Sequence, residues 1–218
     1  MADILSQAEI DALLSAMSSG ELDTEQIQQK DEKKVKNYDF SSPTKFSQDH
    51  LRKLEIIYEH YARLLSTNLP VYLRKNVQVS VVGSEAIKFN EFTNSLSSPI
   101  IMGVVNFAPL NGSIIMELGT NLGYAMLDRM LGGNGMPLEK SRDFSEIEQI
   151  IIEKILVMFV QLLREPWKNV IDISPVLSRL ETNPQFAQVI APSEMVAIVT
   201  LSIKIGDVEG MMTICLPF

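Results

Sequence analysis

The chain has 218 residues, of which 46% are apolar, and its formal net charge at pH 7 is −8. That much apolar sequence can bury a substantial core, and the acidic balance argues against nucleic acid or an anionic membrane as the main partner. The single cysteine, Cys215, rules out a disulfide framework and is typical of a reducing compartment. Because it stands in an apolar run, we expect it to be a small buried side chain.

Two further features predict a soluble intracellular protein. The acidic Asp3 stands where a secretory signal would carry basic residues. The longest apolar run, from Ile155 to Val160, is far shorter than the ~18 residues that a membrane-spanning helix needs.

Residues 1–17 have the pattern of a short amphipathic helix. Ser6 and Glu9 form a capping box, in which the serine caps the helix and the glutamate reaches back to it. Apolar residues then recur at helical spacing and form one stripe: Ile10, Leu13, Leu14 and Met17. Such a helix could dock on the core of its own chain or in a groove on another protein.

Residues 18–45 favour the second possibility. The segment is rich in Gln, Lys, Asp and Glu and has few apolar residues before Tyr38 and Phe40. It cannot bury enough surface to offset the entropy of ordering, so we interpret it as a flexible linker. A short helix isolated by a linker is marginal alone, which favours a partner-binding tether.

The rest of the chain contains an internal duplication. Phe46-Ser47 recurs as Phe144-Ser145, and Asn111-Gly112 aligns with Glu209-Gly210, both at an offset of 98 residues. A single offset at both ends of a long span indicates two repeats, 46–143 and 144–218.

The first repeat opens with a long helix that Ser47 caps and that should end before Pro70. Its apolar residues stand at core spacing: Leu51, Leu54, Ile57, Tyr58, Tyr61, Leu64 and Leu65. A strand is expected at Val77, Val79 and Val81, followed by a short helix over residues 85–96 with Phe89 and Phe92 facing inward.

A hairpin and a third helix complete the first repeat. The hairpin strands are expected at residues 100–107 and 113–118, with the turn at residues 109–112. Thr120 is expected to cap a helix that continues to Leu131, where Gly132 and Gly133 stop it.

The second repeat predicts the same order. Ser145 and Glu148 form a capping box, and the helix to Pro166 carries Ile152, Ile155, Phe159 and Leu162. Strands are expected at residues 176–180, 195–205 and 210–216, and the second hairpin turns at residues 206–209. Val199, Leu201, Ile203 and Ile205 alternate with Thr200, Ser202 and Lys204.

The second repeat stops before its last helix. The counterpart of the helix 120–131 would occupy residues 218–229, and Phe218 is the last residue, so we expect a truncated chain. Long helices and hairpins in both halves predict the α/β class: one pseudo-twofold domain with a largely antiparallel shared sheet and packed helices.

No pattern of known catalytic or metal chemistry stands out. His50 and His60 lie ten residues apart on one helix and point in different directions, and no cysteine cluster accompanies them. No serine stands in a Gly-x-Ser-x-Gly elbow. The sequence therefore predicts no metal site and no cofactor.

The run Gly132, Gly133, Asn134, Gly135 and Met136 is the most unusual motif. A phosphate loop precedes a helix and continues into Lys-Ser/Thr, whereas these glycines follow a helix and are followed by Met136-Pro137. The simplest interpretation is a helix cap and turn, although three glycines exceed what a cap needs. The alternative is an exposed loop that a partner's backbone approaches closely.

These features together resemble the FliM family of flagellar motor switch proteins. Residues 4–14 are similar to that family's N-terminal segment, and Gly132–Gly135 is similar to its Gly-Gly-x-Gly loop. Residues 54–57, 62–63 and 213–218 also resemble the family, so the resemblance extends over the whole chain.

The resemblance implies a CheC-like middle domain in an adaptor that controls flagellar rotation in chemotaxis, at the cytoplasmic face of the inner membrane. Phosphorylated CheY would bind the N-terminal helix through Leu5, Ser6, Glu9, Ile10, Leu13 and Leu14. The rotor protein FliG would contact Gly132, Gly133, Asn134, Gly135 and Met136. Neighbouring FliM copies would stand in a ring, and FliN would bind a C-terminal domain that this chain lacks.

The alternative function is a phosphatase on the same fold. CheC-type enzymes hydrolyse the phosphorylated regulator with Glu-x-x-Asn pairs on the opening helices of both repeats, where the amide positions a water. Here those helices have Glu55 followed by Tyr58 and Glu153 followed by Leu156. The Glu91–Asn94 pair lies outside both long helices, so we expect a non-enzymatic adaptor.

Overall fold

The computed structural model describes residues 45–138, 142–184 and 189–218. The helix expected at residues 1–17 and nearly all of the linker expected at 18–45 lie outside this part of the chain. The described elements are, in order, α3 (Gln48–Leu73), β1 (Val77–Lys88), α4 (Phe89–Ser95), β2 (Ile101–Ala108), β3 (Ser113–Leu118), α5 (Thr120–Met130), α6 (Glu146–Leu162), α7 (Arg164–Trp167), β4 (Ser174–Glu181), β5 (Met195–Ile205) and β6 (Val208–Pro217).

The strands form a six-stranded sheet in the order β1-β5-β6-β3-β2-β4, and every neighbouring pair is antiparallel. Exchanging the three strands of one repeat for their counterparts in the other returns the same order read backwards. The two repeats therefore share one sheet, with β1 and β4 at its edges and β3 and β6 at its centre. This confirms the predicted fold class.

The register of the sheet follows the same twofold relation. At its centre Met116 pairs with Ile214, its own counterpart 98 residues later. Toward the edges, Val77 pairs with Ile205 and Phe107 pairs with Pro175. These two pairs are counterparts, because Pro175 is 98 residues after Val77 and Ile205 is 98 residues after Phe107. Both edge strands carry a register shift partway along, which increases the local twist of the sheet. The pseudo-twofold axis thus passes between β3 and β6.

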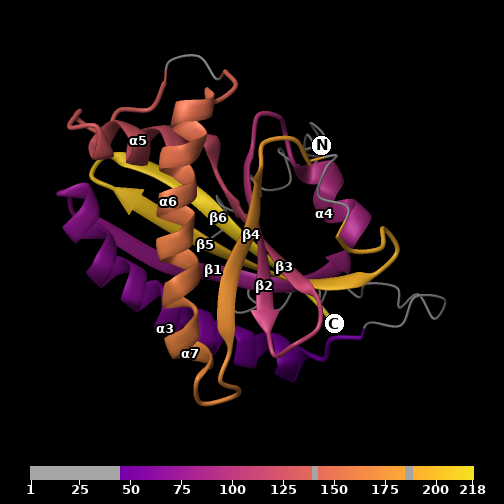
Figure 1. Ribbon diagram of the computed structural model, residues 1–218. Helices are drawn as coiled ribbons and strands as arrows, with labels where there is room; N and C mark the ends of the chain where they lie inside the picture. The colour runs from indigo at the N-terminus through magenta and orange to yellow at the C-terminus, as the bar shows by residue number, and fades with distance from the viewer. Residues whose placement is uncertain (1–44, 139–141, 185–188) are drawn as a thin grey trace, which may run out of the picture. The chain divides into compact units, whose positions relative to one another are not determined.

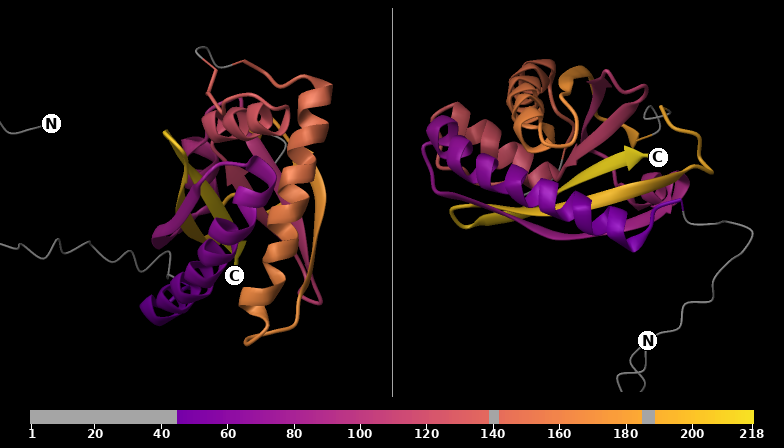
Figure 2. Two further views of the ribbon diagram at one scale, coloured as in Figure 1. Left: turned by 90° about the vertical axis from the view of Figure 1, so that its left-hand side faces the viewer. Right: turned by 90° about the horizontal axis from the view of Figure 1, so that it is seen from below.

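Each face of the sheet is covered differently. The large core forms between the sheet and helices α3, α5 and α6, and it takes Met116 from β3, Leu201 from β5 and Ile214 from β6 (Figures 1 and 2). Successive residues of a strand point to opposite faces, so Ile115 and Cys215, the neighbours of Met116 and Ile214, join a smaller cluster beneath α4 on the other face. Cys215 is buried there, as expected, and burial raises the pKa of its thiol.

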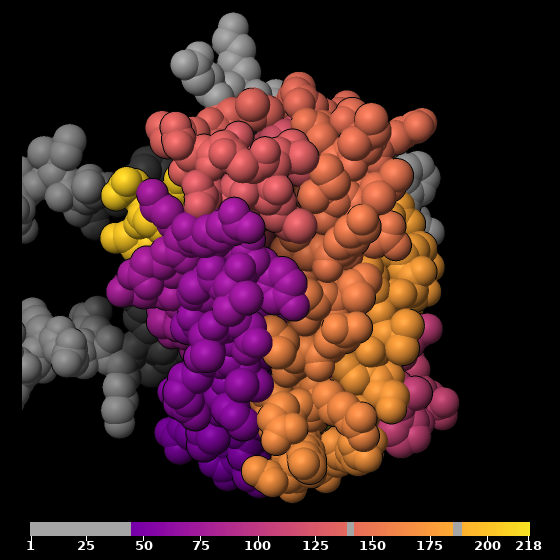
Figure 3. Space-filling view, turned by 60° about the vertical axis from the view of Figure 1, so that its left-hand side comes forward, coloured from indigo at the N-terminus to yellow at the C-terminus, as the bar shows by residue number. Residues whose placement is uncertain are grey.

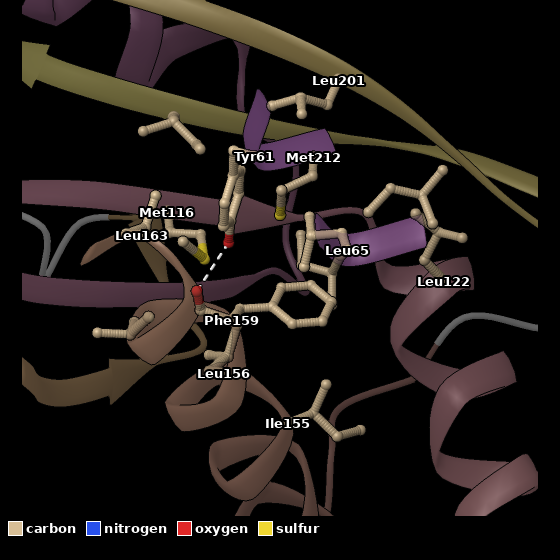
Figure 4. Packing of buried hydrophobic residues seen from close by; sticks show 14 of the residues in the cluster. Tyr61, Leu65, Met116, Leu122, Ile155, Leu156, Phe159, Leu163, Leu201 and Met212 are labelled. Carbon is tan, nitrogen blue, oxygen red and sulfur yellow. Dashed lines mark hydrogen bonds between the residues drawn. The ribbon is translucent and has the colours of Figure 1, made fainter. Parts of the chain in front are cut away.

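The three large helices form a continuous layer over one face of the sheet. In the space-filling view α3 lies along α6, and the α5 segment covers their upper ends (Figure 3). At the centre of this layer Tyr61 of α3 and Phe159 of α6 are fully buried next to Met116 and Met212 (Figure 4). The opening helices of the two repeats therefore meet over the twofold axis of the sheet.

Both opening helices begin at the predicted caps. Ser47 accepts a hydrogen bond from the backbone N–H of His50, and Ser145 accepts one from Glu148. In each case the third helical residue reaches back to the backbone of the serine, which completes a capping box. His50 thus has a structural role at an exposed helix start, while His60 lies half-buried further along α3.

Helix α3 does not end before Pro70, contrary to the prediction. It continues to Leu73 although proline has no N–H to donate to the Ser66 carbonyl. The last turn buries Leu69 and Leu73 completely in the core, and this burial offsets the lost hydrogen bond. Arg74 then closes the helix in the left-handed region with a φ of 48°.

Three other boundaries differ from the prediction. Strand β1 extends through residues 85–88, which were expected to be helical, because it pairs with β5 along its whole length. The short helix α4 accordingly starts at Phe89, with Phe89 and Phe92 facing inward as predicted. Thr120 is the first residue of α5 rather than its cap, since its hydroxyl donates to the Pro99 carbonyl at 2.7 Å.

The helices and strands of the second repeat also differ in their bounds from the prediction. The helix predicted to reach Pro166 is divided into α6 and the short α7 at Leu163. The second hairpin turns through two residues, because Ile205 already pairs with Val208. Strands β4 and β6 each start two residues earlier and end one residue later than predicted. In β5 the apolar alternation is confirmed, with Leu201 and Ile203 fully buried.

Candidate functional site

The glycine run forms a loop, residues 131–136, directly after α5; we call it the glycine loop. Helix α5 ends in a Schellman motif: the Gly133 N–H donates to the Asp128 carbonyl at 2.8 Å, and the Gly132 N–H donates to the Arg129 carbonyl at 3.1 Å. The loop therefore begins as the helix stop that the sequence predicts. Because it follows the carbonyl end of a helix, it cannot present helix amides to a phosphate.

Two glycines of the loop have backbone conformations that other residues rarely adopt. Gly132 has a φ of 93° and Gly135 a φ of 81°. A side chain at either position would be strained, and at Gly135 a Cβ would also press against the side chain of Arg129. The chain reverses at these two points and returns toward α5.

Gly133 is required for a different reason. A Cβ at this position would collide with the carboxylate of Asp128. That carboxylate is fixed, because its Oδ2 accepts from the backbone N–H of Gly135 at 2.7 Å and from that of Met136 at 3.4 Å. Each of the three glycines is thus required for its own structural reason. This explains why the loop contains three glycines, although a helix cap needs fewer.

Arg129 ties the glycine loop to the end of α3. Its Nη1 donates to the Gly133 carbonyl at 2.6 Å, its Nε to the Leu73 carbonyl at 2.8 Å and its Nη2 to the Arg74 carbonyl at 2.8 Å. One guanidinium therefore satisfies three carbonyls on two segments that lie far apart in the sequence. The loop is held from inside by α5 and α3.

The side chains that the loop presents to solvent are mostly apolar. Leu131 and Met136 are each 68% exposed, Leu138 just beyond the loop is also exposed, and Asn134 lies between them in the sequence with an exposed side chain. Exposed large apolar side chains on a fixed loop form a surface suited to contact another protein.

Residues 142–145, which directly precede α6, are held against α5. The rings of Tyr124 and Phe144 stack with centroids 4.2 Å apart, and the Arg142 guanidinium lies over the Tyr124 ring. Arg142 also forms a two-point ion pair with Glu148, which holds the pKa of that carboxyl down at about 2 together with the Ser145 capping box. These contacts tie the start of α6 to the middle of α5.

The structure brings together part of the predicted site. Gly132, Gly133, Asn134, Gly135 and Met136 form one continuous surface loop. The predicted regulator-binding residues lie outside the described part of the chain: Leu5, Ser6, Glu9, Ile10, Leu13 and Leu14. Sequence reasoning missed Asp128 and Arg129, whose only signal is an acid and a base in the last turn of a helix before the glycines.

The positions that correspond to phosphatase residues are not arranged for catalysis. Glu55 accepts a hydrogen bond from the Ser84 hydroxyl at 2.8 Å, and Glu153 is exposed on α6. The residues three positions later, Tyr58 and Leu156, are fully buried in the core. An amide at either position would therefore point away from solvent and could not hold a water for attack on a bound partner.

Other parts of the described chain offer little chemistry. The groups of acids, histidines and cysteines in the described residues include no set that could hold a metal ion. A hollow of about 520 Å³ between α3 and residues 166–170 is lined by Ile56, Ile57, Lys53, His60 and Arg63 on the α3 side, without a carboxylate. None of the described helices has the length and apolar character to span a bilayer.

Comparison with known proteins identifies relatives over the whole chain. The family model described as flagellar motor switch protein FliM matches residues 47–218. FliM of Treponema pallidum is 40% identical over 219 residues, which cover 100% of this chain and 64% of that protein. FliM of Borreliella burgdorferi is 39% identical, covering 98% of this chain and 63% of that protein. The chain thus spans less than two thirds of the length of these curated relatives.

A solved structure agrees with the fold. The FliG–FliM complex from H. pylori contains a chain that superposes with a TM-score of 0.76 at 32% identity, covering 79% of this chain and 94% of that one. The sequence match and the shared pseudo-twofold sheet point to the same family. The chain belongs to the FliM family of flagellar motor switch proteins.

Proposed function

We propose that the chain is a non-enzymatic adaptor of the flagellar motor switch, which binds FliG through the glycine loop and phosphorylated CheY through residues 1–17. The observation that carries the proposal is the fixed glycine loop with Leu131 and Met136 exposed at 68% each. A loop that is rigid before binding loses little conformational entropy when it docks. A related chain is solved in complex with FliG, which supports FliG as the partner.

The proposed organisation has three parts. Residues 1–17 capture the activated regulator through the apolar stripe with Ile10, Leu13 and Leu14. Residues 18–45 act as a tether, which raises the effective concentration of the regulator near the folded domain. Residues 46–218 form the middle domain, in which the repeats 46–143 and 144–218 share one sheet.

In the assembled motor, many copies of the middle domain stand side by side in a ring at the cytoplasmic face of the inner membrane. FliN binds a further domain that follows this part of the longer relatives. Regulator binding biases the orientation of the middle domains, and the glycine loop transmits that bias to FliG and so to the direction of rotation.

A CheC-type phosphatase activity is the second candidate function, and the described residues argue against it. An amide that positions water must face the bound partner, yet the two equivalent positions, Tyr58 and Leu156, are buried. Glu91 and Asn94 are both exposed on α4, but this helix has seven residues and lies on the other face of the sheet from α3 and α6.

The FliG contact is tested by a pair of methionine variants. Met136→Asp places a charge on the exposed tip of the glycine loop, and the matched control Met211→Asp does the same on β6, where the side chain is 45% exposed. In a calorimetric titration with purified FliG we expect Met136→Asp to weaken binding by at least about thirtyfold, the effect of losing one anchor residue. Met211→Asp should bind as the unchanged chain does.

Circular dichroism serves as the folding control, because neither side chain contributes to the core. If Met136→Asp binds FliG with unchanged affinity while both variants remain folded, the glycine loop is not the docking surface.

A further inference from the structure

We infer that Asp128 and Arg129 are positioning residues, which hold the glycine loop in its docking shape and link that shape to the C-terminal end of α3. The inference rests on the proposed FliG function for the use of the loop. The link itself is carried by the hydrogen bonds of these two side chains, neither of which is exposed at the docking surface.

Asp128 shapes the far half of the loop. Its carboxylate accepts from the N–H groups of Gly135 and Met136, two amides that have no helix or strand partner. Hydrogen bonds from N–H groups to a carboxylate are stronger than neutral ones. The carboxylate thereby fixes the backbone of Met136, whose side chain is the exposed anchor.

Arg129 connects the near half of the loop to α3. The last turn of α3 contains no basic residue, and Arg74 follows it at the C-cap. Arg129 of α5 brings a further positive charge to the negative end of this helix, donating to the carbonyls of Leu73, Arg74 and Gly133 at the same time. A shift of the α3 end would therefore break or move the bond that holds Gly133.

Three carbonyls held by one planar guanidinium define a geometry that lysine cannot reproduce. Lysine has a single ammonium group, so Arg129→Lys keeps the charge near α3 but cannot contact all three carbonyls. Asp128→Ala removes the carboxylate that accepts from both loop N–H groups and leaves the Schellman motif, which uses the Asp128 backbone carbonyl. The two variants thus loosen the loop from opposite sides.

The first measurement is amide hydrogen exchange of the free chain, followed at Gly133, Gly135 and Met136. We expect at least about tenfold faster exchange at Gly135 and Met136 in Asp128→Ala, since their N–H groups lose a charged acceptor. In Arg129→Lys we expect a similar increase at Gly133, because its carbonyl loses the Arg129 donor and its peptide group is held less firmly in the hydrogen bond from its own N–H to the Asp128 carbonyl. Tyr61→Phe, which removes a core hydrogen bond far from the loop, is the control for general destabilisation. It should leave the exchange of these three amides unchanged.

The second measurement is the rate of association with FliG. A loop that occupies its docking shape only part of the time binds more slowly by that fraction, so both positioning variants should lower the association rate by about tenfold. Met136→Asp should weaken FliG binding without faster amide exchange in the loop. An anchor residue thus affects binding alone, whereas a positioning residue affects both amide exchange and binding.

The outcomes distinguish the two claims. If the unchanged chain does not bind FliG, the proposed function fails, and the exchange data still decide whether Asp128 and Arg129 hold the loop. Unchanged exchange in both variants would overturn the positioning role. Faster exchange with an unchanged association rate would also overturn it, because the loop shape would then not be used in docking.

Discussion

The Tyr61 hydroxyl of α3 donates a hydrogen bond of 2.9 Å to the Phe159 carbonyl of α6, and the two residues are counterparts in the two repeats, 98 residues apart. The Leu163 N–H, which would be the helical partner of that carbonyl, donates to Val160 instead. Burial, above all, raises the pKa of Tyr61, so the hydroxyl stays protonated. The repeats are thus bonded to each other on their common axis.

Tyr61→Phe should lower the free energy of unfolding by about 1–2 kcal/mol, because it leaves the buried Phe159 carbonyl without a partner. The measurement is urea unfolding at neutral pH. Tyr72→Phe, at a tyrosine that is 55% exposed on the same helix, is the matched control and should leave the free energy of unfolding unchanged.

Tyr58→Phe gives the contrasting case. The Tyr58 ring is as buried as that of Tyr61, but its hydroxyl makes no hydrogen bond of ordinary geometry with the described residues, and the ring packs nearly perpendicular to that of Trp167 with centroids 6.5 Å apart. Removing an unsatisfied buried hydroxyl should be neutral or stabilising by about 1 kcal/mol. A loss of stability equal to that of Tyr61→Phe would contradict the role assigned to the hydrogen bond.

Glu117 should make the fold less stable at alkaline pH. Its side chain is directed to the face of the sheet opposite the large helices, and burial raises its pKa from 4.5 to about 7, partly offset by a hydrogen bond from Thr213. Between these values the folded chain holds a proton that the unfolded chain has released. Stability from this group is therefore full below pH 4.5 and is lost as the pH rises through 7.

Glu117→Gln should remove that dependence and raise stability at pH 8 by on the order of 2 kcal/mol. The measurement is the denaturation midpoint from pH 5 to pH 8. Glu153→Gln, at an exposed carboxylate on α6, should keep the slope of the unchanged chain. A slope that persists in Glu117→Gln would assign the pH dependence to another group.

Gly132→Ala should cost about 1–2 kcal/mol of stability, since it places a side chain at a φ of 93°. Gly83→Ala is the control: no atom lies within 4 Å of a Cβ built there and its φ is not positive. We expect that control to be neutral or slightly stabilising in thermal unfolding. Equal effects of the two substitutions would mean that the loop does not need a glycine at position 132.

Arg142→Gln should raise the pKa of Glu148 from about 2 toward its ordinary range, because the ion pair is the main cause of the depression. A carboxyl with a depressed pKa stabilises the fold above its unfolded pKa, and that stabilisation is lost as the pH falls toward 2. The variant should therefore be less stable near pH 6 and equally stable near pH 2. An NMR titration of the Glu148 carboxyl follows the change directly.

Most of the fold could be predicted from periodicity and from the repeat. The two capping boxes and the exposed hairpin turns are local signals, so residues 47, 145 and their neighbours carry enough information. The end of α3 could not be predicted in this way. Pro70 is a local signal that a helix ends, but the helix continues because Leu69 and Leu73 are buried in the core.

The candidate site likewise has a part that could be predicted from local sequence and a part that could not. The glycines and the exposed Met136 are visible in the sequence, and so is the amphipathic pattern of residues 1–17. The role of Arg129 is not visible, because its partners Leu73 and Arg74 lie about 55 positions away in the chain and meet it only in the folded domain. A side chain that acts through distant backbone carbonyls leaves no spacing pattern.

The adaptor function itself is tested most directly by titrating phosphate-mimic-activated CheY into the chain already saturated with FliG, and into the same complex lacking residues 1–17. The account predicts that the full chain holds both partners at once, and that the deletion abolishes CheY binding while FliG stays bound. CheY binding that survives the deletion, or that displaces FliG, would contradict it. Survival would move the regulator site to the folded domain and favour a phosphatase-like protein.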